Sequence, residues 1–173
     1  AAFIYDIMDD INSIEYCLKT QAKLQPGKTD AYLNLGNFFG QRGLKRKAIK
    51  AYMNGLMINP NDEYIFFNLA SYLCSGDTEE YYETALRYVN QAIKINPNRL
   101  VNYKLRGDIH FFRLYHNEAF CDYQRVLEMK DDPMYEAFYS ECCCKGAKCL
   151  VRTGKKQEAV EFLQKWLKEN PDD

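Results

Sequence analysis

Cysteine is the residue type in this 173-residue chain with the most chemistry to offer, and there are seven of them. Thiolates and imidazoles bind zinc and act as nucleophiles, provided that their spacing brings them together. Cys142, Cys143 and Cys144 are adjacent, and no pair has C-x-x-C spacing. His110 and His116 are six residues apart and fall on different faces of a helix. The spacing predicts no metal site and no disulfide framework. It predicts reduced, packed thiols in a reducing compartment, cytoplasmic or nuclear.

Other candidates for catalysis are equally poor. Gly27-Lys28-Thr29 has the form of the end of a phosphate loop, but Ala22 stands where that loop needs its first glycine. Lys145 next to Cys144 would lower the pKa of that thiol, yet both histidines belong to an earlier segment, out of reach as a base. We expect no enzyme activity and no cofactor.

Composition excludes further classes of function. The formal net charge is -1, with 27% charged residues, so the basic excess of a nucleic-acid-binding domain is absent. No run of 18 apolar residues is present, and the N-terminal stretch lacks the basic flank of a signal peptide. We therefore expect neither nucleic-acid binding nor membrane insertion. The first residue, Ala1, is not Met, which suggests a piece cut from a longer protein.

An internal repeat organises the chain. Asn-Pro-Asn or a close variant recurs, and an alanine stands twelve residues before each proline. The pairs are Ala48 with Pro60, Ala85 with Pro97 and Ala159 with Pro171, and a fourth alanine, Ala119, has Asp131 in the proline position. The alanines are 37, 34 and 40 residues apart, which indicates a 34-residue unit with insertions of three and six.

Each unit shows two stripes of apolar residues at helical spacing, with a short turn between them. In the first complete unit the stripes are Tyr32, Leu35, Gly36 and Phe39, then Ala48, Tyr52, Gly55 and Leu56. Gly36 and Ala48 are small enough for the two helices to approach closely, with the Tyr32 or Tyr52 ring beside them. Pro60 ends the second helix. One helix pair cannot bury its apolar face alone, so the units must stack.

This pattern resembles the tetratricopeptide repeat over residues 29–171. The resemblance implies an all-α, right-handed superhelix of antiparallel helix pairs. The expected segments are a partial repeat at 1–28 that is mainly a second helix, repeats at 29–62, 63–99 and 100–133, and a repeat at 134–173. The second repeat carries a longer turn at 76–80. The last has a first helix extended by residues 134–139, with Pro133 in its opening turn.

The register also places the cysteines. Cys143 fills a large-residue position, Cys144 should face the groove and Cys142 should fall on neither face. The last repeat lacks a polar capping helix, so contact with another domain or with a second copy of the chain is expected there.

In this family the first helices line a concave groove, so the resemblance implies a site for a protein or peptide partner. The predicted peptide-binding residues are Leu33, Asn34, Asn37, Tyr64, Phe67, Asn68, Lys104, Lys145, Lys148 and Arg152. Asn34 and Asn68 share one repeat position, similar to the asparagine ladders of O-GlcNAc transferase and the peroxisomal targeting receptor. An amide donates and accepts, which matches a peptide backbone. Alternatively, these asparagines only solvate the groove or cap neighbours.

Charge in the second half of the groove favours an acidic or C-terminal peptide segment. Lys145, Lys148 and Arg152 are three and four residues apart and share one helical face. The alternative is a solvated face balanced by Glu141.

Co-chaperones of the same family hold a C-terminal carboxylate with a clamp of two asparagines and three cations. The corresponding positions here are Leu33, Asn37, Asn68, Val101 and Leu105. Both asparagines match and every cation is missing, so the charge-assisted bonds of that clamp cannot form. We reject this clamp in its standard register.

The function predicted from the sequence is a non-enzymatic protein-interaction module that binds an extended peptide segment. One alternative is a scaffold subunit, or a piece of a larger assembly that self-associates through its uncapped ends. Another is the substrate-recruiting array of an enzyme whose catalytic domain is absent.

Overall fold

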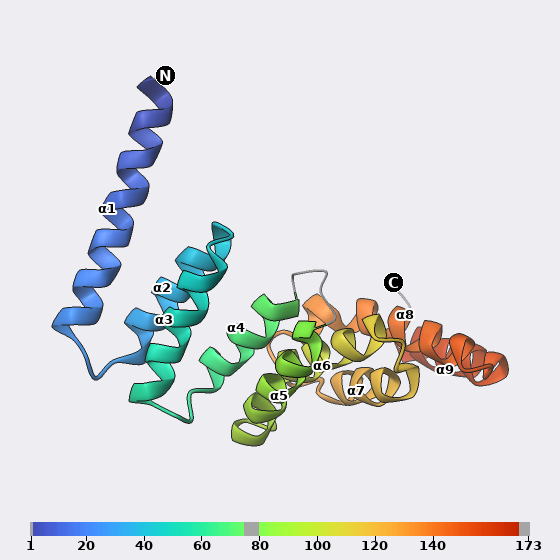
Figure 1. Cartoon of the computed structure of the whole chain (residues 1–173). Helices are drawn as coiled ribbons and strands as arrows, with labels where there is room; N and C mark the ends of the chain where they lie inside the picture. The colour runs from blue at the N-terminus through green and yellow to red at the C-terminus, as the bar shows by residue number, and fades with distance from the viewer. Residues whose placement is uncertain (1, 75–79, 170–173) are drawn as a thin grey trace. The chain divides into compact units, whose positions relative to one another are not determined.

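The computed structural model describes residues 2–74 and 80–169, with side chains at 12–74 and 81–168 (Figure 1). These residues form helices and no strand, so the predicted all-α class is confirmed. The helices are α1 Ala2–Leu24, α2 Thr29–Gln41, α3 Lys45–Ile58, α4 Glu63–Cys74, α5 Glu80–Ile95, α6 Leu100–Phe112, α7 His116–Glu128, α8 Tyr135–Arg152 and α9 Lys156–Glu169. The chain divides into two compact units, Ala1–Tyr72 (unit 1) and Leu73–Asp173 (unit 2).

Small residues bring the helices of unit 1 together. α2 and α3 pack on each other as an antiparallel pair (Figure 1). A Cβ added at Gly36 would overlap the ring of Tyr52, and one added at Gly55 would overlap the side chain of Ile65. Ala48 is fully buried. The close approach predicted at Gly36 and Ala48 is therefore present, with the Tyr52 ring against Gly36.

The recurring Asn-Pro-Asn segments have a local structural reason. α3 ends at Ile58, and the side-chain oxygen of Asn59 accepts a hydrogen bond from the backbone N–H of Asn61 at 3.1 Å. Asn96 and Asn98 repeat this bond at 3.2 Å. The asparagine side chain thus closes a turn around the proline that ends the helix. The third such segment, at 170–172, lies outside the described residues.

Three of the turns between a first and a second helix, all within the described residues, share a left-handed residue. Gly43 has φ 69° and Gly154 has φ 82°, each two residues before the next helix begins. Leu114, at the same place before α7, has φ 63°. Glycine adopts this conformation without cost, whereas a leucine is strained there.

The core of unit 2 lies between α6, α7 and α8. Its fully buried members include Leu100, Tyr123, Val126, Cys142 and Cys149. Cys142 was predicted to fall on neither face, and that prediction is wrong. α8 contacts both α7 and α6, so more of its circumference is covered than the single stripe assumed from the repeat pattern.

Three further predictions concern the length of the first helix in the last repeat, the position of Pro133 and a longer turn at 76–80. α8 has 18 residues against 13 in α6. Pro133 does not lie in its opening turn, because the helix begins at Tyr135 after an N-cap at Met134. The longer turn expected at 76–80 lies outside the described residues except for its last one.

Candidate functional site

The exposed amide of unit 1 is Asn34, on the first helix α2. Its side chain is solvent-exposed and has no hydrogen-bond partner within the part of the chain that the structure describes. Leu33 beside it is half-buried. Asn37 differs, because its Oδ1 accepts a hydrogen bond from the Tyr52 hydroxyl at 2.6 Å. Burial raises the pKa of Tyr52 to about 12, so this hydroxyl keeps its proton and donates. Asn37 is partly committed to holding α2 on α3.

The first helix α4 carries the second predicted amide. Asn68 Nδ2 donates to the backbone oxygen of Tyr64 at 2.7 Å, one turn earlier on the same helix. Its Oδ1 remains as an acceptor without a partner among the described residues. Tyr64 is 56% exposed and Phe67 is half-buried. α4 therefore presents an aromatic surface with an amide acceptor, while α2 presents a complete amide.

In unit 2 the predicted lysines meet carboxylates. The Lys104 ammonium lies 2.8 Å from Asp108 Oδ2 and 3.1 Å from Glu141 Oε2. The Lys145 ammonium lies 2.6 Å from Asp108 Oδ1 and 2.6 Å from Glu141 Oε1. The Tyr123 hydroxyl donates a hydrogen bond to Asp108 Oδ1 at 2.8 Å. We call Lys104, Asp108, Glu141 and Lys145 the four-charge cluster; it joins the two first helices α6 and α8 and has no net charge.

The electrostatics of the four-charge cluster fit stable ion pairs. Burial raises the pKa of Asp108, but hydrogen bonds and charges from Lys104 and Lys145 outweigh burial and hold it below the ordinary value. The same balance lowers the pKa of Glu141. Burial lowers the pKa of Lys145, yet its bonds to the two carboxylates raise it overall. These directions favour the charged forms of Asp108, Glu141 and Lys145.

The predicted basic stripe on α8 is thus divided. Lys145 is neutralised, as the alternative of balance by Glu141 required. Lys148 and Arg152 are exposed and make no ion pair with any described residue. Cys144 is exposed on the same helix, while Cys142 and Cys143 are buried with pKa values raised to about 12 by burial. A pKa this high opposes thiolate chemistry at these two positions.

The sequence pattern missed a buried ion pair between α6 and α7. Arg106 donates from Nε to Asp122 Oδ2 at 2.9 Å and from Nη2 to Oδ1 at 2.6 Å, and its third nitrogen bonds Asn90 at 2.8 Å. Asp122 is almost fully buried. Arg106 stands where the repeat register places an apolar residue, which is the signal that could have revealed it. These bonds tie Arg106 on α6 to Asp122 on α7 and to Asn90 on α5.

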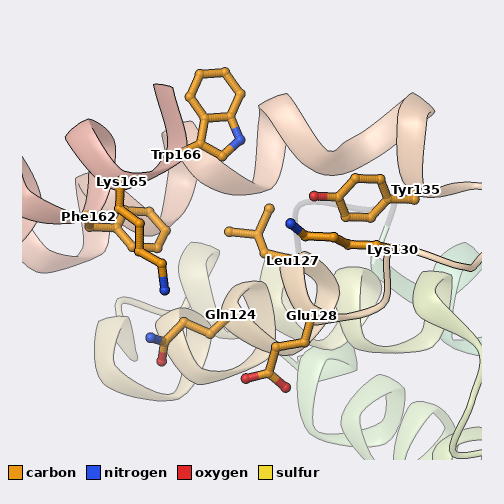
Figure 2. A pocket seen from close by; sticks show the side chains of 8 residues that line it. All are labelled: Gln124, Leu127, Glu128, Lys130, Tyr135, Phe162, Lys165 and Trp166. Carbon is orange, nitrogen blue, oxygen red and sulfur yellow. The ribbon is translucent and has the colours of Figure 1, made fainter. Parts of the chain in front are cut away.

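A pocket that contains none of the predicted residues opens in unit 2 beside the second helices (Figure 2). Its volume is about 330 Å³. Figure 2 shows its lining side chains, from α7, the segment after it, the start of α8 and α9: Gln124, Leu127, Glu128, Lys130, Tyr135, Phe162, Lys165 and Trp166. Aromatic and aliphatic groups in this lining are mixed with charged groups of both signs.

The described part of the chain holds neither a cluster of metal ligands nor a membrane-spanning helix. Within residues 12–74 and 81–168, no three His, Cys, Asp or Glu side chains converge as metal ligands. None of the described helices combines the length and the apolar character that crossing a bilayer requires.

Comparison with known proteins identifies the repeat. Residues 29–62, which hold α2 and α3, match the family model described as tetratricopeptide repeat. Residues 29–62 therefore form a tetratricopeptide repeat. Two curated relatives are each 26% identical and cover 76% of this chain: the TPR repeat-containing protein MJ1428 of Methanocaldococcus jannaschii and the Hsp70-Hsp90 organizing protein 3 of Arabidopsis thaliana. The match covers only 22% and 23% of their lengths.

Solved structures share this fold at low sequence identity. The crystal structure of MamA has a TM-score of 0.76 at 18% identity, covering 96% of this chain and 86% of that one. YrrB, described as a TPR protein with an unusual peptide-binding site, has a TM-score of 0.71 at 17% identity, covering 99% and 84%. At such identities the likeness shows the fold alone.

Proposed function

We propose that this tetratricopeptide-repeat protein is a non-enzymatic interaction module that binds an extended peptide segment of a partner on its first helices. The fold and the relatives support a protein-interaction module in general. The peptide and the residues that bind it are our proposal.

The observation that carries this proposal is the exposed Asn34 amide on α2. The Asn34 amide is exposed and makes no hydrogen bond to a described residue, and an amide can pair with a peptide group whatever side chain that peptide residue carries. Asn68 occupies the same repeat position on α4 and keeps an acceptor available. A backbone that followed both helices would meet one amide per repeat.

Apolar neighbours must add to the amide contacts. A hydrogen bond contributes only about 1 kcal/mol net, so two amides alone bind a peptide weakly. Leu33 flanks Asn34, and Tyr64 and Phe67 flank Asn68, so each amide lies beside apolar or aromatic surface. Aromatic side chains at interfaces bury large areas and dominate binding energy. We expect alternate side chains of the peptide to contact these three residues.

The test is a double substitution measured against a matched control. A peptide selected on an array is titrated with the wild type and with Asn34→Ala plus Asn68→Ala. Loss of two hydrogen bonds of about 1 kcal/mol each predicts affinity roughly thirty-fold lower. The control is Asn54→Ala plus Asn117→Ala, which removes two amides from the second helices α3 and α7. Equal affinities for the two double variants would contradict the proposal.

The name of one relative suggests a chaperone as the partner, but the sequence of this chain argues against the same mode of binding. The Arabidopsis relative is named for organising Hsp70 and Hsp90. The cation positions of the carboxylate clamp hold Leu33, Val101 and Leu105 in this chain. Without those cations a C-terminal carboxylate has no partner in that register.

A second candidate function is a piece of a larger assembly, and one surface favours it. Phe112, Leu114 and Tyr115, at the turn between α6 and α7, are 64%, 73% and 45% exposed. Contiguous exposed apolar groups mark interaction sites. In this case the partner would contact the turn and not the first helices.

A further inference from the structure

We propose that the ammonium groups of Lys104 and Lys145 form a carboxylate-binding site that Glu141 occupies in the free chain. A partner's acidic side chain would displace Glu141 and take over its bonds. This rests on the proposed function, because it specifies the charge of the segment that binds on α6 and α8.

The two carboxylates of the four-charge cluster are held differently. The Asp108 side chain is 17% exposed and accepts bonds from both lysines and from the Tyr123 hydroxyl. The Glu141 side chain is 43% exposed, and its described partners are the two lysines alone. Asp108 is therefore a fixed part of the fold, whereas Glu141 covers the lysines from the solvent side.

Displacement of Glu141 is an exchange of like bonds, because the incoming carboxylate takes over the two lysines that Glu141 leaves. The Glu141 side chain is 43% exposed and pairs with Lys145 one turn along its own helix. Once released, the Glu141 carboxylate is solvated by water. The incoming carboxylate gains the same two charge-assisted hydrogen bonds, from ammonium groups whose side chains are only 16% and 22% exposed. The lysines are already positioned by Asp108, so they lose no further freedom on binding.

The surroundings favour an acidic peptide over a single ion. The Phe138 ring lies 5.1 Å from the Lys104 ammonium and offers apolar contact beside the charge. Lys148 and Arg152 continue along α8, exposed and without ion pairs among the described residues. A segment with several carboxylates would place one between Lys104 and Lys145 and others near these two cations. Such complementarity speeds encounter and selects acidic partners.

The experiment compares two substitutions that each remove one negative charge from the full 173-residue chain. Fluorescence anisotropy follows a labelled hexaglutamate peptide with an amidated C-terminus at about 0.1 M salt, where exposed charges still act. Glu141→Gln removes the competing carboxylate, so we expect affinity about ten-fold higher than wild type. Glu158→Gln on α9 makes the same change in net charge at an exposed pair with Lys155 and should leave affinity near wild type.

Two further variants and a second peptide test which group of the ligand binds and whether the effect is specific to this site. Glu141→Ala should give the same gain, and Lys145→Met should weaken binding below wild type. If the amidated peptide binds as tightly as the same peptide with a free C-terminal carboxylate, the site recognises acidic side chains. A requirement for the free terminus would overturn that assignment.

The inference fails if Glu141→Gln binds no tighter than Glu158→Gln while both keep the circular dichroism of the wild type. If array peptides still depend on Asn34 and Asn68, only this inference fails. If no peptide binds any variant, the proposed function fails as well.

Discussion

At the scale of single residues, Asp108 shows how one side chain can serve both fold and site. It is largely buried, and Lys104, Lys145 and Tyr123 all direct hydrogen bonds at it. An ionised carboxylate in such a place stabilises the fold only while its cations remain charged. Asp108 therefore makes the stability of unit 2 depend on pH.

The direction in which the stability of unit 2 changes at low pH follows from the pKa of Asp108. Burial opposes ionisation of Asp108, but the two lysines outweigh it, so the folded pKa lies below the unfolded value of about 3.9. The stabilisation is complete above the unfolded pKa and is lost as pH falls through the folded pKa. We expect Asp108→Asn to be less stable than wild type at pH 7 and to lose less stability below about pH 4. Urea unfolding at several pH values checks this, and parallel curves would contradict it.

At the scale of helices and turns, some features could be read from the sequence and others could not. Gly36 against Tyr52 and the Asn59 turn depend on neighbours within one repeat, so the repeating pattern contains them. Arg106 with Asp122 and Lys145 with Asp108 join residues 16 and 37 positions apart. Nothing in a one-dimensional pattern indicates which charge on one helix meets which on another. Helix register and rotation decide it.

The burial of Cys142 was missed for a similar reason. The repeat pattern assigns each first helix one buried stripe, taken from helices of 13 residues. α8 has 18 residues and lies against α6, α7 and α9, so it is covered on more than one side. Insertions of this kind are where a family pattern loses its predictive value.

The turn before α7 gives a prediction about stability. Leu114 holds φ 63° where Gly43 and Gly154 stand in the matching turns, and its side chain is 73% exposed. Leu114→Gly should raise the free energy of unfolding by about 1 kcal/mol, since the cost of a left-handed leucine exceeds the added entropy of the unfolded glycine. Chemical denaturation measures the difference.

Leu114→Ala is the matched control for this turn. It removes the exposed side chain but keeps the Cβ, so the strain remains. The explanation by strain is wrong if the alanine variant gains as much stability as the glycine variant.

At the scale of the whole molecule, the candidate residues fall into two sets. Leu33, Asn34, Asn37, Tyr64, Phe67 and Asn68 belong to unit 1, and Lys104, Lys145, Lys148 and Arg152 belong to unit 2. All ten lie on first helices, α2, α4, α6 and α8. The sequence pattern located these four helices correctly, and their part in peptide binding stays a prediction. It could not show that Asn37 and Lys145 are already engaged within the chain, because their partners are on other helices.

The most direct test of the central claim is to map a bound peptide by nuclear magnetic resonance on the isotope-labelled chain. The array-selected peptide is added, and changes in backbone and side-chain amide signals are followed residue by residue. Our account predicts that the largest changes occur on α2 and α4, with the side-chain amides of Asn34 and Asn68 among them. Changes confined to Phe112–Tyr115 or to the pocket lined by Phe162 and Trp166, with the first helices unaffected, would contradict it.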